Sequence, residues 1–196
     1  MTPVTIACIV EGHGETAALP ALLRRMDAEG GLRVVVAGRV NRTTVVKPGE
    51  LESQVEAAAL SVRPRGAVLI LLDSDDDCPK ELAPKLLERA MLASIGLPVA
   101  VVLAEREFET WFVAAAESLA GHRNLPPALT CPANPERIRD AKGWLSSQMP
   151  ANRPYSPPRD QPALAAIFDI PTARERAPSF DKFCREVERL IAHWHD

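Results

Sequence analysis

An apolar run in the middle of the chain ends in a cluster of acids. Residues 68–72 are all aliphatic, and Asp73, Asp75, Asp76 and Asp77 follow within five positions. Two carboxylates about 4 Å apart repel each other by about 4 kcal/mol at an effective dielectric constant of about 20. A divalent cation among the side chains would relieve that repulsion, and so would side chains that splay into water. The spacing therefore indicates either a metal site or a solvated acidic loop.

Two other predicted strands also end in acidic residues. Glu11 follows the apolar residues 3–10, and Glu107 and Glu109 follow residues 98–104. In open α/β sheets, ligands bind at the carboxyl ends of the strands. A sheet of order 2-1-3-4 makes the first and third strands neighbours, which would bring Glu11 close to Asp73. Oxygen donors without histidine or cysteine favour Mg²⁺ or Mn²⁺ as the cofactor.

The segments that must position these acids alternate along the first 120 residues. Strands are predicted at residues 3–10, 32–37, 67–72 and 98–104, and helices at 17–29, 50–61 and 79–96. This alternation predicts a doubly wound, Rossmann-like α/β fold with about four parallel strands and flanking helices. Since proline removes a backbone donor, Pro20 is expected in the first turn of its helix, which would then begin at residues 16–18. Residues 38–49 are predicted to form a polar loop that carries Arg39, Arg42 and Lys47.

The composition changes after residue 120, because most of the 18 prolines lie beyond it. Helices are predicted from about residue 107 to 120 and at 135–148, 161–168 and 179–194. We therefore expect an α/β domain at residues 1–120 and a proline-rich helical extension at 121–196. A chain of 196 residues suits one structural unit, with the extension packed on the sheet domain.

Charge and cysteine content narrow the classes of function. Residues 1–120 hold 12 basic and 17 acidic residues, a balance of −5, whereas residues 121–196 hold 11 and 9, a balance of +2. The extension could therefore face nucleic acid. The four cysteines show no metal-ligand spacing, so we expect reduced thiols. Without a basic leader or a run of about 20 apolar residues, a cytoplasmic protein with no membrane span is expected.

The acidic motifs resemble the Toprim signature. Val10-Glu11-Gly12 resembles its glutamate after the first strand, and Asp73-x-Asp75 resembles its DxD after the third. With Asp77 and Glu107-Phe108-Glu109-x-Trp111, the pattern is similar to a bacterial Toprim-like family, a domain of unknown function. The resemblance implies Mg²⁺-dependent phosphodiester hydrolysis, with Glu11 as general acid/base and Asp73 and Asp75 as metal ligands.

The resemblance also suggests roles for residues other than Glu11, Asp73 and Asp75. Asp77 would bind metal directly or through water, and Glu107 and Glu109 would form a second metal site or an outer shell. Lys142 and Arg159 are candidate phosphate contacts, with solvated cations as the alternative.

The kind of Toprim reaction is limited by what the chain lacks. A topoisomerase needs a tyrosine nucleophile, yet the single tyrosine, Tyr155, lies in a proline-rich stretch. A primase would carry a zinc module and a basic surface, and the sequence shows neither. A nuclease is therefore the preferred hypothesis. The alternative is a non-catalytic, metal-binding partner of an ATPase or of a nucleic-acid-processing complex. The oligomeric state is left open.

Overall fold

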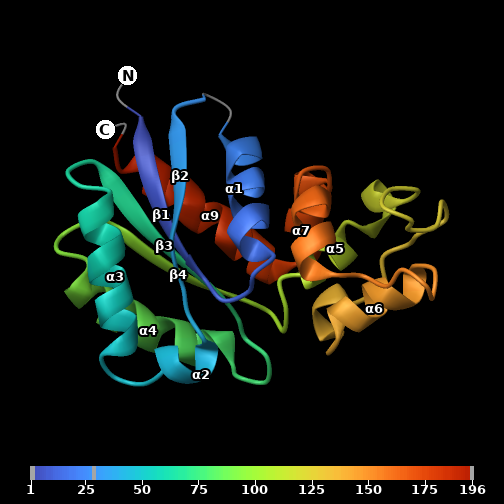
Figure 1. The fold of residues 1–196 in the computed structure, drawn as a ribbon, viewed down its shortest axis with the longest axis horizontal. Helices are drawn as coiled ribbons and strands as arrows, with labels where there is room; N and C mark the ends of the chain where they lie inside the picture. The colour runs from blue at the N-terminus through green and yellow to red at the C-terminus, as the bar shows by residue number, and fades with distance from the viewer. Residues whose placement is uncertain (1–2, 28–29, 195–196) are drawn as a thin grey trace.

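A four-stranded parallel sheet lies at the centre of the computed structural model, which describes residues 3–27 and 30–194 (Figure 1). The strands are β1 (Val4–Val10), β2 (Leu32–Arg39), β3 (Gly66–Asp73) and β4 (Val99–Ala104). Their order is β2-β1-β3-β4, and every neighbouring pair is parallel. The predicted order and the doubly wound α/β class are confirmed.

Helices cover both faces of this sheet (Figure 1). They are α1 (Glu15–Met26), α2 (Arg42–Val45), α3 (Glu50–Ser61), α4 (Pro79–Ala93), α5 (Thr110–Ala114), α6 (Ala141–Gln148), α7 (Pro157–Ala165), α8 (Ile170–Arg176) and α9 (Pro178–Ala192), with 3₁₀ turns η1 (Ala116–Leu119) and η2 (Pro135–Arg137). Helices α3 and α4 pack on one face, while α1 and α9 pack on the other. None of the helices in the described part of the chain has the length and apolarity that a bilayer span requires.

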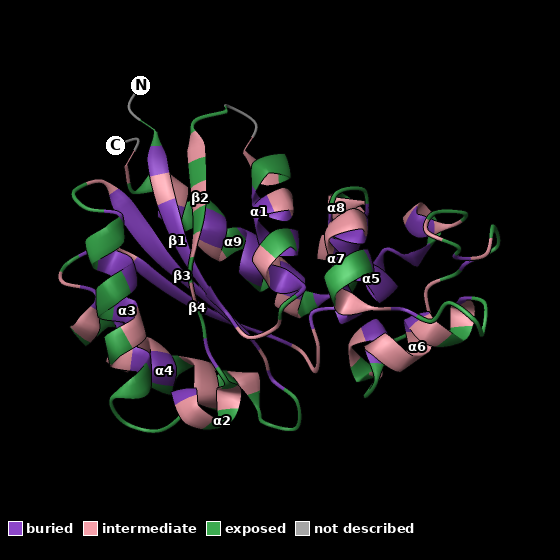
Figure 2. Cartoon of the chain, in the orientation of Figure 1, coloured by how far each residue is buried: buried purple, intermediate pink, exposed green. Residues whose placement is uncertain are grey.

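Strand β3 is buried on both faces, which explains its unbroken apolar sequence (Figure 2). Leu69 and Leu71 point into the core formed with α1 and α9, whereas Val68, Ile70 and Leu72 point into the core formed with α3 and α4. The edge strand β2 instead alternates between half-buried and exposed residues. A central strand that is buried on both faces therefore carries the acidic cluster.

An aromatic cluster ties the C-terminal region to the sheet domain. The ring of Trp111 is fully buried, and its centroid lies 4.8 Å from that of Phe108, 4.9 Å from that of Phe180 and 5.0 Å from that of Phe183. Its Nε1–H donates to Ser179 Oγ at 2.9 Å. Residues from the sheet, from α5 and from α9 thus share one hydrophobic core.

Several expectations for the region after β4 are wrong in detail. The helix expected to reach residue 120 ends at Ala114, and a 3₁₀ turn follows it. The helix expected at 135–148 is divided, since Asp140 accepts the N–H of Gly143 and begins α6 there. Helix α7 begins earlier than the predicted 161–168 because Pro157 occupies its first position. Helix α8 was not predicted at all.

Two expectations nearer the N-terminus also need correction. Helix α1 begins at Glu15, so Pro20 lies inside the helix and not in its first turn. The predicted loop at 38–49 contains the end of β2 and the short helix α2, which Asn41 caps by accepting the N–H of Thr43 at 2.9 Å. The expected helix end at Glu29 lies outside the described residues.

The first prediction concerns the aromatic cluster. We expect Trp111→Ala to lower the free energy of unfolding by about 3–5 kcal/mol, because it leaves a cavity where the sheet domain meets α9. Urea denaturation followed by circular dichroism measures this loss. The matched control is Leu60→Ala, whose side chain is 58% exposed on α3; its effect should stay within about 0.5 kcal/mol. Equal effects of the two substitutions would contradict the assigned role of Trp111.

Candidate functional site

One lysine ammonium lies among three carboxylates at the carboxyl edge of the sheet. Lys142, on α6, places Nζ 3.3 Å from Asp73 Oδ2, 2.9 Å from Glu107 Oε1 and 3.3 Å from Glu109 Oε2. Asp73 ends β3, and both glutamates follow β4. Three of the predicted metal ligands and one predicted phosphate contact therefore meet in one cluster, which we call the Lys142 cluster.

Backbone hydrogen bonds fix the members of the Lys142 cluster. Asp73 Oδ1 accepts the N–H of Phe108 at 2.8 Å, and Glu107 Oε2 accepts the N–H of Lys142 at 3.1 Å. The Asp140 cap holds the first turn of α6, where a Cβ on Gly143 would lie 2.0 Å from Asp140 Oδ2. The lysine is thus held both by its ammonium group and by its own peptide bond.

Glu109 is the most deeply buried acid of the cluster, with 0% of its surface exposed. Its Oε1 accepts the hydroxyl of Tyr155 at 2.9 Å. Burial raises the pKa of Glu109 to about 7, against the opposing effect of the Lys142 ammonium. The pKa of Tyr155 is itself raised by burial and by Glu109, so this hydroxyl serves as a hydrogen-bond donor to the site.

Glu15 is a site residue that the sequence reasoning missed. It is 4% exposed, and its Oε2 accepts the N–H groups of Glu11 at 3.1 Å and of Gly12 at 3.2 Å. Burial and then the charge of Asp73 raise its pKa to about 8. Its position in the first turn of α1 is also typical of an acid that stabilises a helix N-terminus, so the sequence pattern alone does not mark it as a site residue.

Glu11 lies at the same edge, after β1, and is half-buried. Its Oε2 is buried and has no hydrogen-bond partner among the described residues. Burial and the neighbouring Asp73 raise the pKa of Glu11, and burial likewise raises that of Asp73 despite the nearby Lys142. Four carboxyl groups, those of Glu11, Asp73, Glu107 and Glu109, thus lie at this edge, where Lys142 supplies one ammonium.

The other aspartates after β3 pair with arginines around the rim of the site. Arg42, from α2, pairs with Asp75 at 2.9 Å and also with Asp77. Asp76 pairs with Arg106 at 2.7 Å and with Arg139. These aspartates are exposed and do not join the Lys142 cluster.

Arg159, the second predicted phosphate contact, lies beside a different acid. It pairs with the buried Asp160, which also pairs with Arg123, and it donates to the carbonyl of Pro154 at 2.6 Å. Against the opposing effect of burial, the two arginines and the N–H of Ser156 lower the pKa of Asp160. Arg159 therefore makes its described contacts within the extension and not with the Lys142 cluster.

The residues present match a divalent cation in chemistry more closely than in arrangement. Every acidic donor is a hard oxygen, and Glu11 has a buried oxygen without a hydrogen-bond partner in the described chain. Within residues 3–27 and 30–194, however, no three histidine, cysteine or acidic side chains are arranged as a ready metal site. The ammonium of Lys142 lies between the acids, so a cation would need this lysine to move.

Comparison with known proteins supplies a family. The sequence model of a domain of unknown function (DUF4276) matches residues 10–188, which include β3, β4 and every acid of the site. The searches of curated proteins and of solved structures give no match.

The second prediction is a pH dependence of stability. Glu15 and Glu109 have a pKa of about 8 and about 7 in the folded protein. Between about pH 5 and pH 8 the folded state keeps protons that the unfolded chain has released, so the free energy of unfolding falls as pH rises. The fall reaches about 1.4 kcal/mol per pH unit for each group. Urea denaturation at several pH values should show a shallower slope for Glu109→Gln.

The matched control for this titration is Glu175→Gln. Glu175 is exposed on α8, and no ion pair is described for it. Its substitution should leave the slope of the wild-type protein unchanged. If Glu109→Gln has the same slope as the wild-type protein, Glu109 does not hold a proton in the folded state near neutral pH.

Proposed function

Because the chain belongs to the DUF4276 family, a domain of unknown function, we propose its activity from the site: Mg²⁺- or Mn²⁺-dependent hydrolysis of phosphodiester bonds in nucleic acid. One observation carries the proposal. Acids that follow three different strands, Glu11 after β1, Asp73 at the end of β3 and Glu107 after β4, meet at one edge with more negative charge than Lys142 neutralises. A relationship to Toprim domains is part of the proposal, supported by Val10-Glu11-Gly12 after β1 and Asp73-x-Asp75 after β3.

The excess of carboxylates supports a divalent cation in this site. Asp73, Glu107 and Glu109 would hold it, and Asp75 and Asp77 could join if they left Arg42. When bound, the cation would stabilise charge on the phosphoryl oxygens and lower the pKa of an attacking water. Its binding would also lower the raised pKa values of these acids, because a nearby positive charge favours the carboxylate form.

The chain's own residues would carry the proton transfer and hold the substrate. Glu11 has a raised pKa and a buried oxygen without a hydrogen-bond partner in the described chain, so it can accept a proton from the attacking water. Lys142, freed from one carboxylate, would donate hydrogen bonds to a phosphate oxygen. Arg42, Arg106 and Arg139 lie at the rim, where guanidinium groups can position a nucleic acid backbone.

A second candidate is a non-catalytic protein that works beside an ATPase or a nucleic-acid-processing complex. The observation that favours it is the Lys142 ammonium, which already lies within 3.3 Å of an oxygen of each of the three carboxylates without any metal. For either role we propose a reducing, cytoplasmic setting, supported by four cysteines that are all free thiols.

The third prediction separates the two candidates. Purified protein is incubated with single- and double-stranded DNA and RNA in the presence of Mg²⁺ or Mn²⁺. We expect cleavage that falls by about a hundredfold or more in Glu11→Gln and Asp73→Asn, because each removes a group with a direct role in the reaction. The control Glu175→Gln should cleave at the wild-type rate. Equal cleavage by the wild-type protein and both site variants would exclude the catalytic assignment.

The fourth prediction concerns Lys142 and metal affinity. Without metal, Lys142→Met should lower the unfolding temperature, because three carboxylates lose their counter-ion. Millimolar Mn²⁺ should raise the unfolding temperature of both proteins, and more strongly that of Lys142→Met, since the competing ammonium is gone. A concentration ten times the dissociation constant stabilises the folded state by about 1.4 kcal/mol.

Thermal unfolding scans with and without Mn²⁺ measure these shifts. Lys47→Met is the control, because Lys47 is an exposed lysine outside the site, in the turn before α3. It should behave as the wild-type protein does in both scans. The absence of a metal-dependent shift in the wild-type protein and in Lys142→Met alike would leave the site without a divalent cation.

A further inference from the structure

The lobe that contains α6 is positively charged, although the whole chain carries −3 (Figure 1). Residues 122–159 hold six basic and two acidic residues, a balance of +4. The basic residues are Arg123, Arg137, Arg139, Lys142, Arg153 and Arg159. Most of them are arginines, whose planar guanidinium groups match the geometry of phosphate. The net positive charge of the C-terminal region therefore comes from this lobe.

Three of these arginines lie around one buried acid. Asp160 of α7 has 1% of its side chain exposed, and it pairs with Arg123 at 3.2 Å and with Arg159 at 2.6 Å. Arg159 also donates to the carbonyl of Pro154 at 2.6 Å. Arg153, which directly precedes that proline, is exposed, and no ion pair is described for it. Among the described residues, the three guanidinium groups thus have one carboxylate partner between them, and we call them the arginine patch.

The two paired arginines of the patch keep free donors. The described side-chain hydrogen bonds of Arg123 use only Nη2, and those of Arg159 use Nε and Nη2. Their side chains are 35% and 39% exposed. Because each Nη1 carries two N–H groups, Asp160 holds both guanidinium groups in place and leaves donors for a ligand. Phosphate oxygens accept such pairs of donors.

The backbone that carries Arg123 is held in an uncommon conformation. Arg123 has a φ of 52° and Asn124 a φ of 67°, in the left-handed region that side chains other than glycine seldom adopt. The N–H of Leu125 donates to the carbonyl of His122 at 2.9 Å and closes this turn. Strain of this kind persists only where the surrounding contacts impose it, and it is concentrated at binding sites.

The arginine patch adjoins the carboxylate site through two neighbouring residues. Tyr155, which lies between two patch arginines in the chain, donates its hydroxyl to Glu109 at 2.9 Å. Gln161 is 1% exposed, and its buried Oε1 has no hydrogen-bond partner among the described residues. That oxygen lies 2.0 Å from the place of a Cβ on Gly14, so α7 packs directly on the loop that carries Glu11. The patch is therefore next to acids that follow both β1 and β4.

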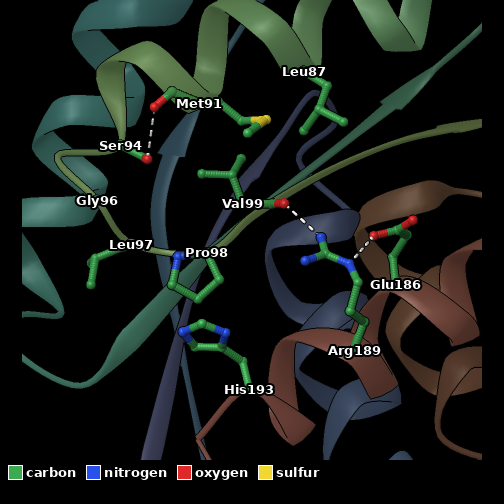
Figure 3. Close-up of a pocket in the computed structure, with 10 residues that line it drawn as sticks. All are labelled: Leu87, Met91, Ser94, Gly96, Leu97, Pro98, Val99, Glu186, Arg189 and His193. Carbon is green, nitrogen blue, oxygen red and sulfur yellow. Dashed lines mark hydrogen bonds and ion pairs between the residues drawn. The ribbon is translucent and has the colours of Figure 1, made fainter.

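The basic residues around α9 are more nearly balanced. Four cations there form ion pairs with three acids: the cations are Arg174, Lys182, Arg185 and Arg189, and the acids are Asp181, Glu186 and Glu188. Figure 3 shows one of these pairs, Arg189 with Glu186 at 2.8 Å, beside a hollow of about 480 Å³. The arginine patch, with three cations and one acid, has the larger excess of positive charge.

We propose that the arginine patch binds phosphate groups of a nucleic acid strand and holds that strand beside the carboxylate site. The identity of this ligand rests on the phosphodiester hydrolysis proposed above, because a strand cleaved at the Lys142 cluster must continue across the adjoining surface. The Nη1 groups of Arg123 and Arg159 donate to phosphate oxygens, and Arg153 adds a third charge. These arginines position the strand and do not contact the reacting atoms.

Binding of a labelled oligonucleotide tests the patch without any cleavage. The full chain is titrated in EDTA against fluorescein-labelled oligo-deoxythymidine, and fluorescence anisotropy gives Kd at several KCl concentrations. Arg153→Gln, which removes no described side-chain contact, should raise Kd about fivefold at low salt and reduce the slope of log Kd against log salt by about 0.7. Arg123→Gln, in which Arg159 still pairs with Asp160, should do the same. The control Arg24→Gln, at an exposed arginine of α1 without a described ion pair, should match the wild-type protein.

Two competitors identify the chemistry of the ligand. A strand with uncharged methylphosphonate linkages and a glutamate homopeptide should both compete at least tenfold more weakly than the unlabelled oligonucleotide. Equal competition by the glutamate peptide would overturn the proposal, and so would an unchanged Kd and salt slope in both patch variants. Cleavage with binding unchanged in both variants would refute the patch alone, whereas patch-dependent binding without cleavage would refute the hydrolysis alone.

Discussion

The charge balance around Lys142 is the constraint on which the rest of the site depends. Asp73, Glu107 and Glu109 can be held together at the end of a buried sheet only if positive charge lies among them, and the ammonium supplies it at 2.9–3.3 Å. The three carboxylates raise the pKa of Lys142, so the lysine stays charged. One positive charge does not balance all the acids, and burial, with the charge of Asp73, raises the pKa of both Glu15 and Glu109.

This constraint explains why the C-terminal region belongs to the site. Lys142 and Tyr155 both lie after residue 120, yet they contact acids that follow β3 and β4. The aromatic packing of Trp111 against Phe180 and Phe183 holds that region on the sheet. The strand ends therefore supply the negative charge, while helix α6 supplies the cation and the loop before α7 supplies the hydroxyl donor that stabilise the buried acids.

The fold was predictable because its signals are local. Consecutive aliphatic residues indicate that β3 is buried on both faces, and the alternation of strands and helices indicates a parallel sheet. Pairing across the sheet edge was not predictable, because the partner of Asp73 lies 69 residues away. The requirement for glycine at position 14 was also not predictable, because it arises from a residue far away in the sequence. Gly14 has an ordinary φ of −66°, but a Cβ there would lie 2.0 Å from Gln161 Oε1, a contact no local pattern reveals.

The loop after β4 joins the rim of the site to its buried centre. Arg106 donates its N–H to Ser74 Oγ at 2.8 Å and pairs with Asp76, so it links this loop to the loop after β3. Glu107 follows directly and contacts the Lys142 ammonium at 2.9 Å. Because Arg106 and Glu107 are adjacent in the chain, the contacts that hold the rim also hold a carboxylate of the Lys142 cluster in place.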